Sequence, residues 1–318
     1  MSEPIPLSYS DQAKLFQTRG MKITNLENAT KMLGQLGYYR VKEVARPLAK
    51  VVDKDISYVG VSFDEVISRY YQDKNLRVYL LHCIEELEVS IKTNVAYILG
   101  KSGPFTYLKF PSWCNRQEYC KYYLADREKD FKKRLRTKLS NSNNPEISKS
   151  NNLNQKKFPS IWLAIDVLTF GDVIHLVDLM SNTHQKKLAN FYNCTPSEFL
   201  SWIKCLKFVR NICAHNSNII DIKLNTTPLI HDDWKTILFQ MPNGRYTDRI
   251  AVILCVLKRM MRYVNPSYNY SKIYSPINAI STNLKLANQL GFQSMEALEI
   301  LFPKKEHKRN PKRRNLKK

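Results

Sequence analysis

Glycine is scarce in this sequence, with 9 glycines among 318 residues. Glycine-containing pairs supply the tight turns between short strands, so their scarcity argues against a β-sandwich or a β-barrel. Leucine, lysine, glutamate, glutamine and alanine recur instead at helical spacing. The sequence therefore predicts an all-α fold.

Cysteine pairs and long apolar runs are also missing. The seven cysteines are an odd number, and no two are spaced as Cys-x-x-Cys, which disfavours a disulfide scaffold or a zinc site. The apolar run Ile250–Leu257 is too short to span a bilayer, and residues 1–12 lack the apolar core of a signal peptide. We expect a cytoplasmic protein with no metal, no cofactor and no membrane partner.

Acidic residues are outnumbered, because 50 lysines and arginines face 28 aspartates and glutamates, for a net charge of +22. The tail over residues 304–318 holds +8 of this charge, and we expect it to be a disordered basic arm. The other residues therefore share +14. A protein this basic repels itself unless an anionic partner neutralises it, and nucleic acid is the usual one.

Helical periodicity begins near the N-terminus. Two short helices are predicted over residues 8–20 and 25–36, within an N-terminal helical subdomain that covers residues 1–60. Ser62-x-x-Glu65 is a capping box that should open a helix running to Tyr70. A long helix follows over residues 73–99, because apolar residues recur there in steps of three and four.

Residues 61–303 are expected to form a larger helical domain. Residues 115–139 predict a highly charged helix, and the polar insertion at 140–157 has almost nothing apolar, so it predicts a loop or a disordered segment. Residues 159–180 predict two helical pieces that are broken near Gly171.

Two later helices have start signals. Thr195-Pro196-Ser197-Glu198 combines a capping threonine, a proline in the first position and a glutamate three residues after the cap, so a helix should run to about residue 216. Thr247 predicts the cap of a helix that ends near Val264. With the long helix and the pair over 159–180, these helices should form one bundle. Two shorter helices close the fold, over residues 277–290 and 294–302.

The segment from Phe208 to Asn216 carries the residues best suited to chemistry. Asn211 and His215 are four residues apart and share a helix face, and Arg210 lies about 100° round the helix. A histidine can transfer protons near neutral pH, and an arginine can bind a phosphate through two hydrogen bonds. This set suits RNA cleavage, in which the 2′-hydroxyl attacks the adjacent phosphorus. From the spacing alone, surface or capping roles remain the commoner explanation.

The hexapeptide Arg210–His215 resembles the Arg-x-x-x-x-His signature of HEPN ribonucleases, in the form seen in the AbiD/AbiF abortive-infection family. Further similar blocks follow the family's order over about residues 8–220: Arg19-Gly20-Met21, Leu36-Gly37-Tyr38-Tyr39-Arg40, Leu76-Arg77, Ile84-Glu85-Glu86-Leu87-Glu88, Gly103-Pro104-Phe105, Pro159-Ser160-Ile161-Trp162, Thr169-Phe170-Gly171 and Phe199-Leu200-Ser201-Trp202. The family often has a second histidine and then an arginine after the motif, where this chain has Asn216, Ser217 and Asn218.

This resemblance implies a HEPN-type helical bundle and a metal-independent endoribonuclease toxin of phage defence. Arg210, Asn211 and His215 would be catalytic, and a homodimer would supply the second copy of the motif that such enzymes use. A structured non-coding RNA would be bound and would regulate the nuclease. Families of this kind can also bring an acidic group near the histidine, for which Glu85 is the candidate. A solvated helix face is the more common role for such a glutamate.

Several further residues are predicted to bind RNA. Tyr38, Tyr39 and Arg40 can stack on bases, although packing at a helix end explains them equally well. Lys312, Arg313 and Arg314 in the tail would strengthen binding without sequence preference. A merely solvated face is the alternative for the cations of the charged helix, which are Lys121, Arg127, Lys132, Lys133, Arg134 and Arg136.

Two other functions fit the same sequence. The chain can be a noncatalytic RNA-binding protein that uses the Arg/His motif only for phosphate contact. It can also be a HEPN protein that a separate nucleotide-transferring partner modifies, because the chain itself shows no nucleotide-binding loop.

Overall fold

The computed structural model describes residues 5–52 and 55–303. It is predominantly all-α, as the sequence predicted. The strands among these residues form one antiparallel hairpin, β1 (Lys50–Val52) and β2 (Asp55–Ser57). The predicted basic arm, with Lys312, Arg313 and Arg314, lies outside the described residues.

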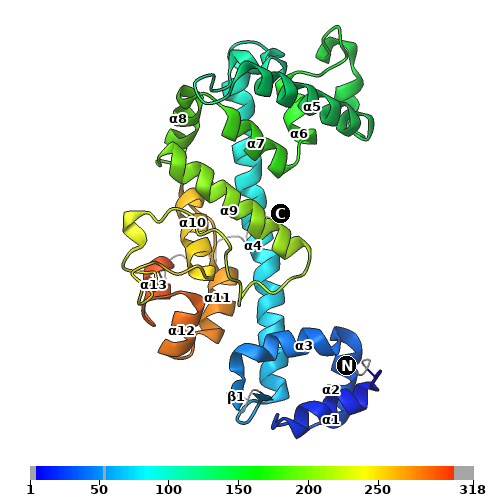
Figure 1. The fold of residues 1–318 in the computed structure, drawn as a ribbon, viewed down its shortest axis with the longest axis vertical. Helices are drawn as coiled ribbons and strands as arrows, with labels where there is room; N and C mark the ends of the chain where they lie inside the picture. Colours follow the sequence, from blue (N-terminus) through cyan, green and yellow to red (C-terminus); the bar gives the residue numbers. More distant parts are fainter. Residues whose placement is uncertain (1–4, 53–54, 304–318) are drawn as a thin grey trace, which may run out of the picture.

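One long helix, α4 (Phe63–Gly100), runs through most of the length of the molecule (Figure 1). Its capping residue is the predicted one, since the Ser62 hydroxyl accepts a hydrogen bond from the backbone N–H of Glu65. The two helices predicted over 62–70 and 73–99 are continuous in the structure. No glycine or proline occurs between Phe63 and Leu99, so nothing in that stretch breaks the helix.

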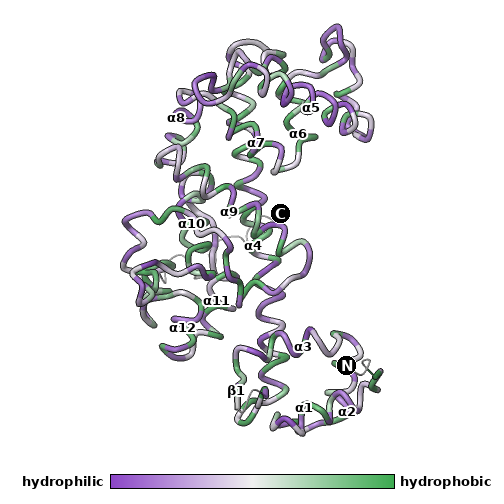
Figure 2. Tube along the Cα trace, in the orientation of Figure 1, coloured by the Kyte–Doolittle hydropathy of each residue, from purple (hydrophilic) through white to green (hydrophobic). Residues whose placement is uncertain are grey.

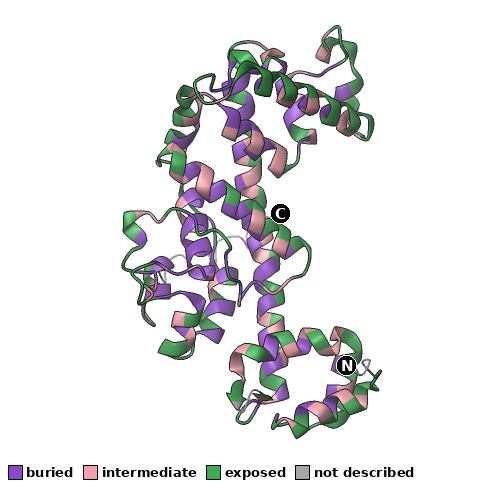
Figure 3. Cartoon of the chain, viewed as in Figure 1, coloured by how far each residue is buried: buried purple, intermediate pink, exposed green. Residues whose placement is uncertain are grey.

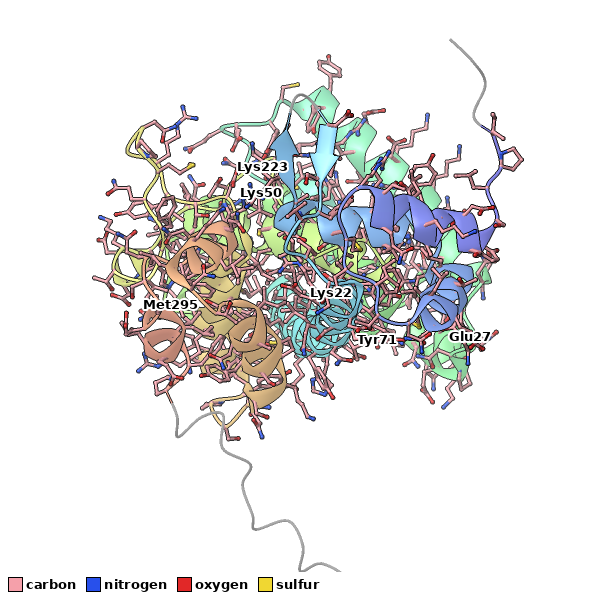
Figure 4. The ribbon with its side chains drawn as sticks, turned by 90° about the horizontal axis from the view of Figure 1, so that it is seen from below. Lys22, Glu27, Lys50, Tyr71, Lys223 and Met295 are labelled. Atoms are coloured by element: carbon pink, nitrogen blue, oxygen red, sulfur yellow. The ribbon has the colours of Figure 1, made fainter. Side chains whose placement is uncertain are left out.

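The N-terminal part has a small hydrophobic core of its own. Three helices surround it: α1 (Tyr9–Thr18), α2 (Leu26–Leu36) and α3 (Tyr38–Ala45). The first turns of α4 contribute Phe63 and Val66 to this core, and Lys22, labelled in Figure 4, bonds through its backbone to the start of α4. The predicted subdomain boundary at residue 60 stays a prediction.

The main core lies around α4 and is formed by helices from the second half of the chain. These helices are α6 (Ile161–Val167), α7 (Phe170–Leu179), α9 (Pro196–Ala214), α10 (Ile250–Val264) and α11 (Ser271–Ile280). Most of α10 is buried, as Figure 3 shows. The predicted bundle omitted α11, which packs on α4 beside α10.

The predicted break near Gly171 is present. It falls at Leu168 and Thr169, because Thr169 and Asp172 form a capping box that starts α7 just before Gly171. Two other predicted boundaries were wrong. Thr247 does not cap α10, whose N-cap is Arg249. The charged helix α5 (Lys121–Ser140) begins later than predicted.

Other elements went unpredicted or were merged in the prediction. Helices α3 and α8 (Asn182–Phe191) were not predicted, and residues 277–290 contain the end of α11 and a separate helix, α12 (Leu284–Leu290). Helix α13 (Ala297–Leu301) ends the described chain. Within the polar insertion Ile147 is buried, so this segment is not wholly a solvated loop. Short 3-10 turns occur at Arg46–Leu48, Thr106–Leu108, Phe110–Ser112, Pro145–Ser148, Ser150–Asn152 and Asp232–Trp234.

Across the described ranges, no helix combines the length and the apolar character that crossing a membrane requires.

The chain that follows α9 is fixed to α4 by a buried ion pair. Asp73 and Arg77 lie one turn apart on α4, 2.8 Å from each other, and are 3% and 4% exposed. Arg77 donates to two carbonyls of the next segment, and Asp73 accepts from two of its N–H groups. These partners, at 2.7–3.0 Å, are the carbonyls of Asn216 and Ser217 and the N–H groups of Ile219 and Ile220.

This segment, which we call the 216–220 turn, is therefore held through its backbone by a donor and an acceptor on one helix. Burial raises the pKa of Asp73, while the two N–H groups and Arg77 oppose that rise. A second ion pair, between Arg69 and Asp221, binds the residue just after the turn to α4. The Asn218 side chain also donates to Asp221, at 2.9 Å.

We expect Asp73→Ala to lower the free energy of unfolding by about 3–5 kcal/mol, because removing one partner leaves a buried charge unpaired. Two backbone N–H groups would lose their acceptor as well. Chemical denaturation measures the change. Asn75→Ala, an exposed position two residues along α4, is the control and should shift the value by less than about 0.5 kcal/mol. A loss below about 1 kcal/mol for Asp73→Ala would show that the pair does not anchor the turn.

Candidate functional site

Helix α9 presents the predicted motif, and its start follows the predicted capping pattern. The Thr195 hydroxyl accepts from the Glu198 N–H at 3.2 Å, and the Glu198 carboxylate accepts from the Thr195 N–H at 2.9 Å. Pro196 occupies the first turn, where its missing N–H costs no hydrogen bond. These local bonds fix where α9 begins and hence which residues face outward.

The helix ends at the motif histidine. His215 is the C-cap, and Asn216 adopts the left-handed conformation with φ +57°. The Asn216 N–H donates to the Cys213 carbonyl at 3.3 Å, and the Ser217 N–H donates to the Ile212 carbonyl at 3.1 Å. This pair of bonds is a Schellman motif, in which asparagine is the usual substitute for glycine. Asn216 therefore stops α9 directly after His215.

The three predicted catalytic side chains lie on the outer surface of α9. Arg210, Asn211 and His215 are exposed, whereas Val209 and Cys213 face the core. Within the described ranges, no hydrogen bond or ion pair joins these three side chains. Nor does any group of three or more His, Cys, Asp or Glu side chains there have an arrangement that could hold a metal ion.

Arg210 and Asn211 line a groove of about 610 Å³ between α9, α4, α5 and the start of α7. We call it the basic groove. Its other polar side chains come from four helices, and they are Glu88, Lys92, Arg134, Thr169, Asp172 and Lys207. His215 is not among the lining residues and lies one helical turn beyond Asn211.

Cations outnumber acids in the basic groove. Lys92 pairs with Glu88 at 2.9 Å, and Arg134 lies 3.9 Å from Asp172. Lys207 and Arg210 form no ion pair with any residue that the structure describes. The groove therefore keeps a net positive charge beside the motif and suits a polyanion.

Asp172 stays ionised in this surrounding. Its burial acts to raise the pKa, but hydrogen bonds from Thr169 and Lys138 outweigh that effect and lower the pKa overall. The carboxylate is also part of the cap of α7. The carboxylate of Asp172 therefore caps α7 and pairs with Arg134 and Lys138 of α5. It does not neutralise Lys207 and Arg210 of α9.

Gly171 allows Lys207 to lie against the first turn of α7. A Cβ atom at Gly171 would stand 3.3 Å from the Lys207 Nζ, which is tighter than ordinary van der Waals contact. Lys207 precedes Arg210 by three residues and Asn211 by four, so all three share one side of α9. The sequence analysis missed Lys207 and Lys92, although the spacing of Lys207 was a usable signal.

Two glutamates of α4, the predicted Glu85 and the nearby Glu88, lie about one turn apart. Glu85 is exposed and does not line the basic groove. Glu88 lines it and is paired with Lys92. The glutamate of α4 that lines the groove together with Arg210 and Asn211 is thus Glu88.

Helix α5 is strongly hydrophilic, as Figure 2 shows, but most of its predicted RNA-binding cations already have partners. Only Arg134 among them lines the basic groove. Lys121 and Lys133 are exposed. The partners of the other cations are Asp126 and Asp130 for Arg127, Glu128 for Lys132, and the ring of Phe158, at 4.7 Å, for Arg136.

The N-terminal candidates differ from one another. The Tyr38 ring packs 4.9 Å from that of Phe16, and its hydroxyl accepts from Arg19. Tyr39 is 78% exposed. Arg40 donates to the backbone carbonyl of Asn216, so it touches the turn that follows the motif.

Comparison with known proteins identified a family. Searches among curated proteins and among solved structures returned no match. The family model described as Abi-like protein matches residues 31–221, a range that contains the basic groove, the motif and the 216–220 turn. Because this match covers more than half of the 318 residues, the chain belongs to the Abi-like protein family, which points to abortive infection, a defence against phage.

Proposed function

We propose that this protein is a metal-independent HEPN-type endoribonuclease that acts as a toxin in abortive infection. The observation that carries the proposal is the placement of the motif: Arg210 and Asn211 line a basic groove, and the exposed His215 follows one turn later. Membership of the Abi-like family supports the biological role.

Each group has a role that its chemistry allows. The imidazole of His215 removes the proton from a ribose 2′-hydroxyl, and the freed oxygen attacks the adjacent phosphorus. Arg210 binds the phosphate and stabilises the negative charge that builds on its oxygens. Asn211 orients the substrate. The bond from phosphorus to the 5′-oxygen then breaks, leaving a 2′,3′-cyclic phosphate.

The departing 5′-oxygen needs a proton from the opposite side of the phosphorus. The same Arg-x-x-x-x-His spacing also occurs at Arg77–His82, but Arg77 is buried in the pair with Asp73, so Arg210–His215 is the copy that can meet RNA. A second subunit is then the simplest source of a second exposed motif and its imidazole. A homodimer would pair two exposed His215 side chains across one RNA strand. Light scattering that finds only monomers at concentrations where RNA is cut would remove this part of the proposal.

The charge of the whole chain supports a second RNA partner. The basic groove accounts for only a small part of the net charge of +22. A structured non-coding RNA bound elsewhere on the surface would neutralise the remaining charge. In the cytoplasm, this bound RNA would also restrain the nuclease. Sequencing of nucleic acid that copurifies with the protein tests this idea, and a protein that is free of RNA when isolated would contradict it.

A noncatalytic RNA-binding protein is the alternative, and one observation favours it. The motif side chains are not hydrogen-bonded to one another among the described residues, and the cations of the basic groove are sufficient for phosphate contact. This protein would bind RNA in a salt-sensitive way and cut none of it.

We expect the purified protein to cleave single-stranded RNA in the presence of EDTA, and His215→Ala to lower kcat by roughly 10²–10⁴-fold, the usual effect of removing an acid–base group. The thermal midpoint should not change, because the side chain is exposed. His82→Ala, which removes an exposed imidazole from α4, is the control. The result that favours the alternative is RNA binding by the wild-type protein without any cleavage.

We expect Lys207→Ala to weaken RNA binding, with a decrease of about 0.7 in the slope of log K against log salt, the change for one phosphate contact on a single strand. Lys187→Ala, which removes an exposed lysine from α8, should change affinity less than Lys207→Ala does. Equal effects of the two substitutions would show that RNA does not enter the basic groove.

A further inference from the structure

The N-terminal helices contact the motif region through Arg40 of α3. The Arg40 Nη1 donates to the carbonyl of Asn216, the residue that follows His215. The same carbonyl accepts from the Arg77 Nη1 at 2.9 Å. Two guanidinium groups, one from each of two helices, therefore meet on one backbone oxygen beside the proposed catalytic histidine.

The Asn216 carbonyl oxygen accepts its hydrogen bonds from helices other than α9. Asn216 lies beyond the last turn of α9, so no N–H group of that helix can bond to its carbonyl. A helix end frays unless groups from elsewhere hold it. Hydrogen bonds to the Asn216 carbonyl hold the residue that closes the Schellman motif, and they therefore oppose unwinding of the backbone at His215.

The two guanidinium groups are not equivalent. Arg77 is 4% exposed and is part of the buried pair with Asp73, so its removal would damage the fold. Arg40 is only half-buried, and no ion pair fixes it among the residues described. Its hydrogen bond can therefore be removed without leaving a buried charge unpaired.

We propose that the N-terminal helices α1–α3 are a positioning element for His215, and that Arg40 is the positioning residue. This inference rests on the proposed role of His215 in RNA cleavage. It differs from the sequence-based expectation that Arg40 binds RNA, because its guanidinium bonds to the protein's own backbone.

The two roles of Arg40 predict different kinetics. A group that contacts RNA contributes to binding, so its loss raises KM and lowers the dependence of binding on salt. A group that positions the imidazole contributes when the proton moves, so its loss lowers kcat and leaves KM nearly unchanged.

The experiment compares Arg40→Ala, Arg40→Lys and Lys31→Ala. Arg40→Ala should lower kcat roughly tenfold with KM within about twofold, since one hydrogen bond from a charged group contributes about that factor. Arg40→Lys should recover most of kcat, because an ammonium can still donate to the Asn216 carbonyl. Lys31, an exposed cation on α2, is the control, and its substitution should leave kcat unchanged.

Hydrogen exchange gives a readout that does not depend on catalysis. The amide groups of Asn216 and Ser217 close the end of α9, so peptides over residues 211–220 should exchange roughly tenfold faster in Arg40→Ala. The thermal midpoint should stay close to that of the wild type. Arg40→Lys should exchange at nearly the wild-type rate.

The outcomes separate the two proposals. A wild-type protein that cuts no RNA would refute the proposed function, and faster exchange in Arg40→Ala would still establish that α3 holds the end of α9. Unchanged exchange in Arg40→Ala would overturn the positioning inference. A raised KM with unchanged kcat would also overturn it, because Arg40 would then be an RNA contact.

Discussion

The ion pair between Asp73 and Arg77 is the constraint on which the motif region depends. A helix end is held only by bonds within its last turn unless another element supplies partners. Here α4 supplies an acceptor for two N–H groups and a donor for two carbonyls of the 216–220 turn. The segment after α9 is thus anchored by a helix that carries none of the motif, and Arg40 of α3 adds its bond to this anchored backbone.

Such a pair is costly to bury, since both charges lose their hydration. The cost is offset because each charge meets more than its partner: Asp73 also accepts from two amides, and Arg77 also donates to two carbonyls. An apolar pair of similar volume could fill the same space, but it could not bind the backbone of a turn. We interpret the ion pair as a device for fixing one backbone conformation beside the motif.

The sequence predicted the local features of this region and missed the ones that depend on distant residues. The cap at Thr195 was visible because all its groups lie within four residues. The basic groove was not visible, since Lys92, Arg134 and Arg210 come from three helices far apart in the chain. Asp73 and Arg77 resemble an ordinary exposed pair at helical spacing, and only the fold shows that they are buried.

The helix boundaries show the same limit. Gly171 predicted a break, but Thr169 and Asp172 provide a cap two residues earlier, and Gly171 serves the close approach of Lys207. Residues 62–99 contained two good helix signals with no breaker between them, and the structure joins them. A glycine or a capping residue thus indicates where a helix can begin or break. The other residues around it decide whether the helix does so there.

The exposure of the motif bears on how catalysis could occur. Charges stabilise a transition state weakly when bulk water surrounds them, and far more strongly in a site that excludes water. Arg210, Asn211 and His215 are all exposed in the single chain, so bulk water would weaken the stabilisation that they give to the transition state. The proposed dimer would supply the missing cover together with the second imidazole. The exclusion of water and the supply of a proton to the leaving oxygen therefore both favour a dimer.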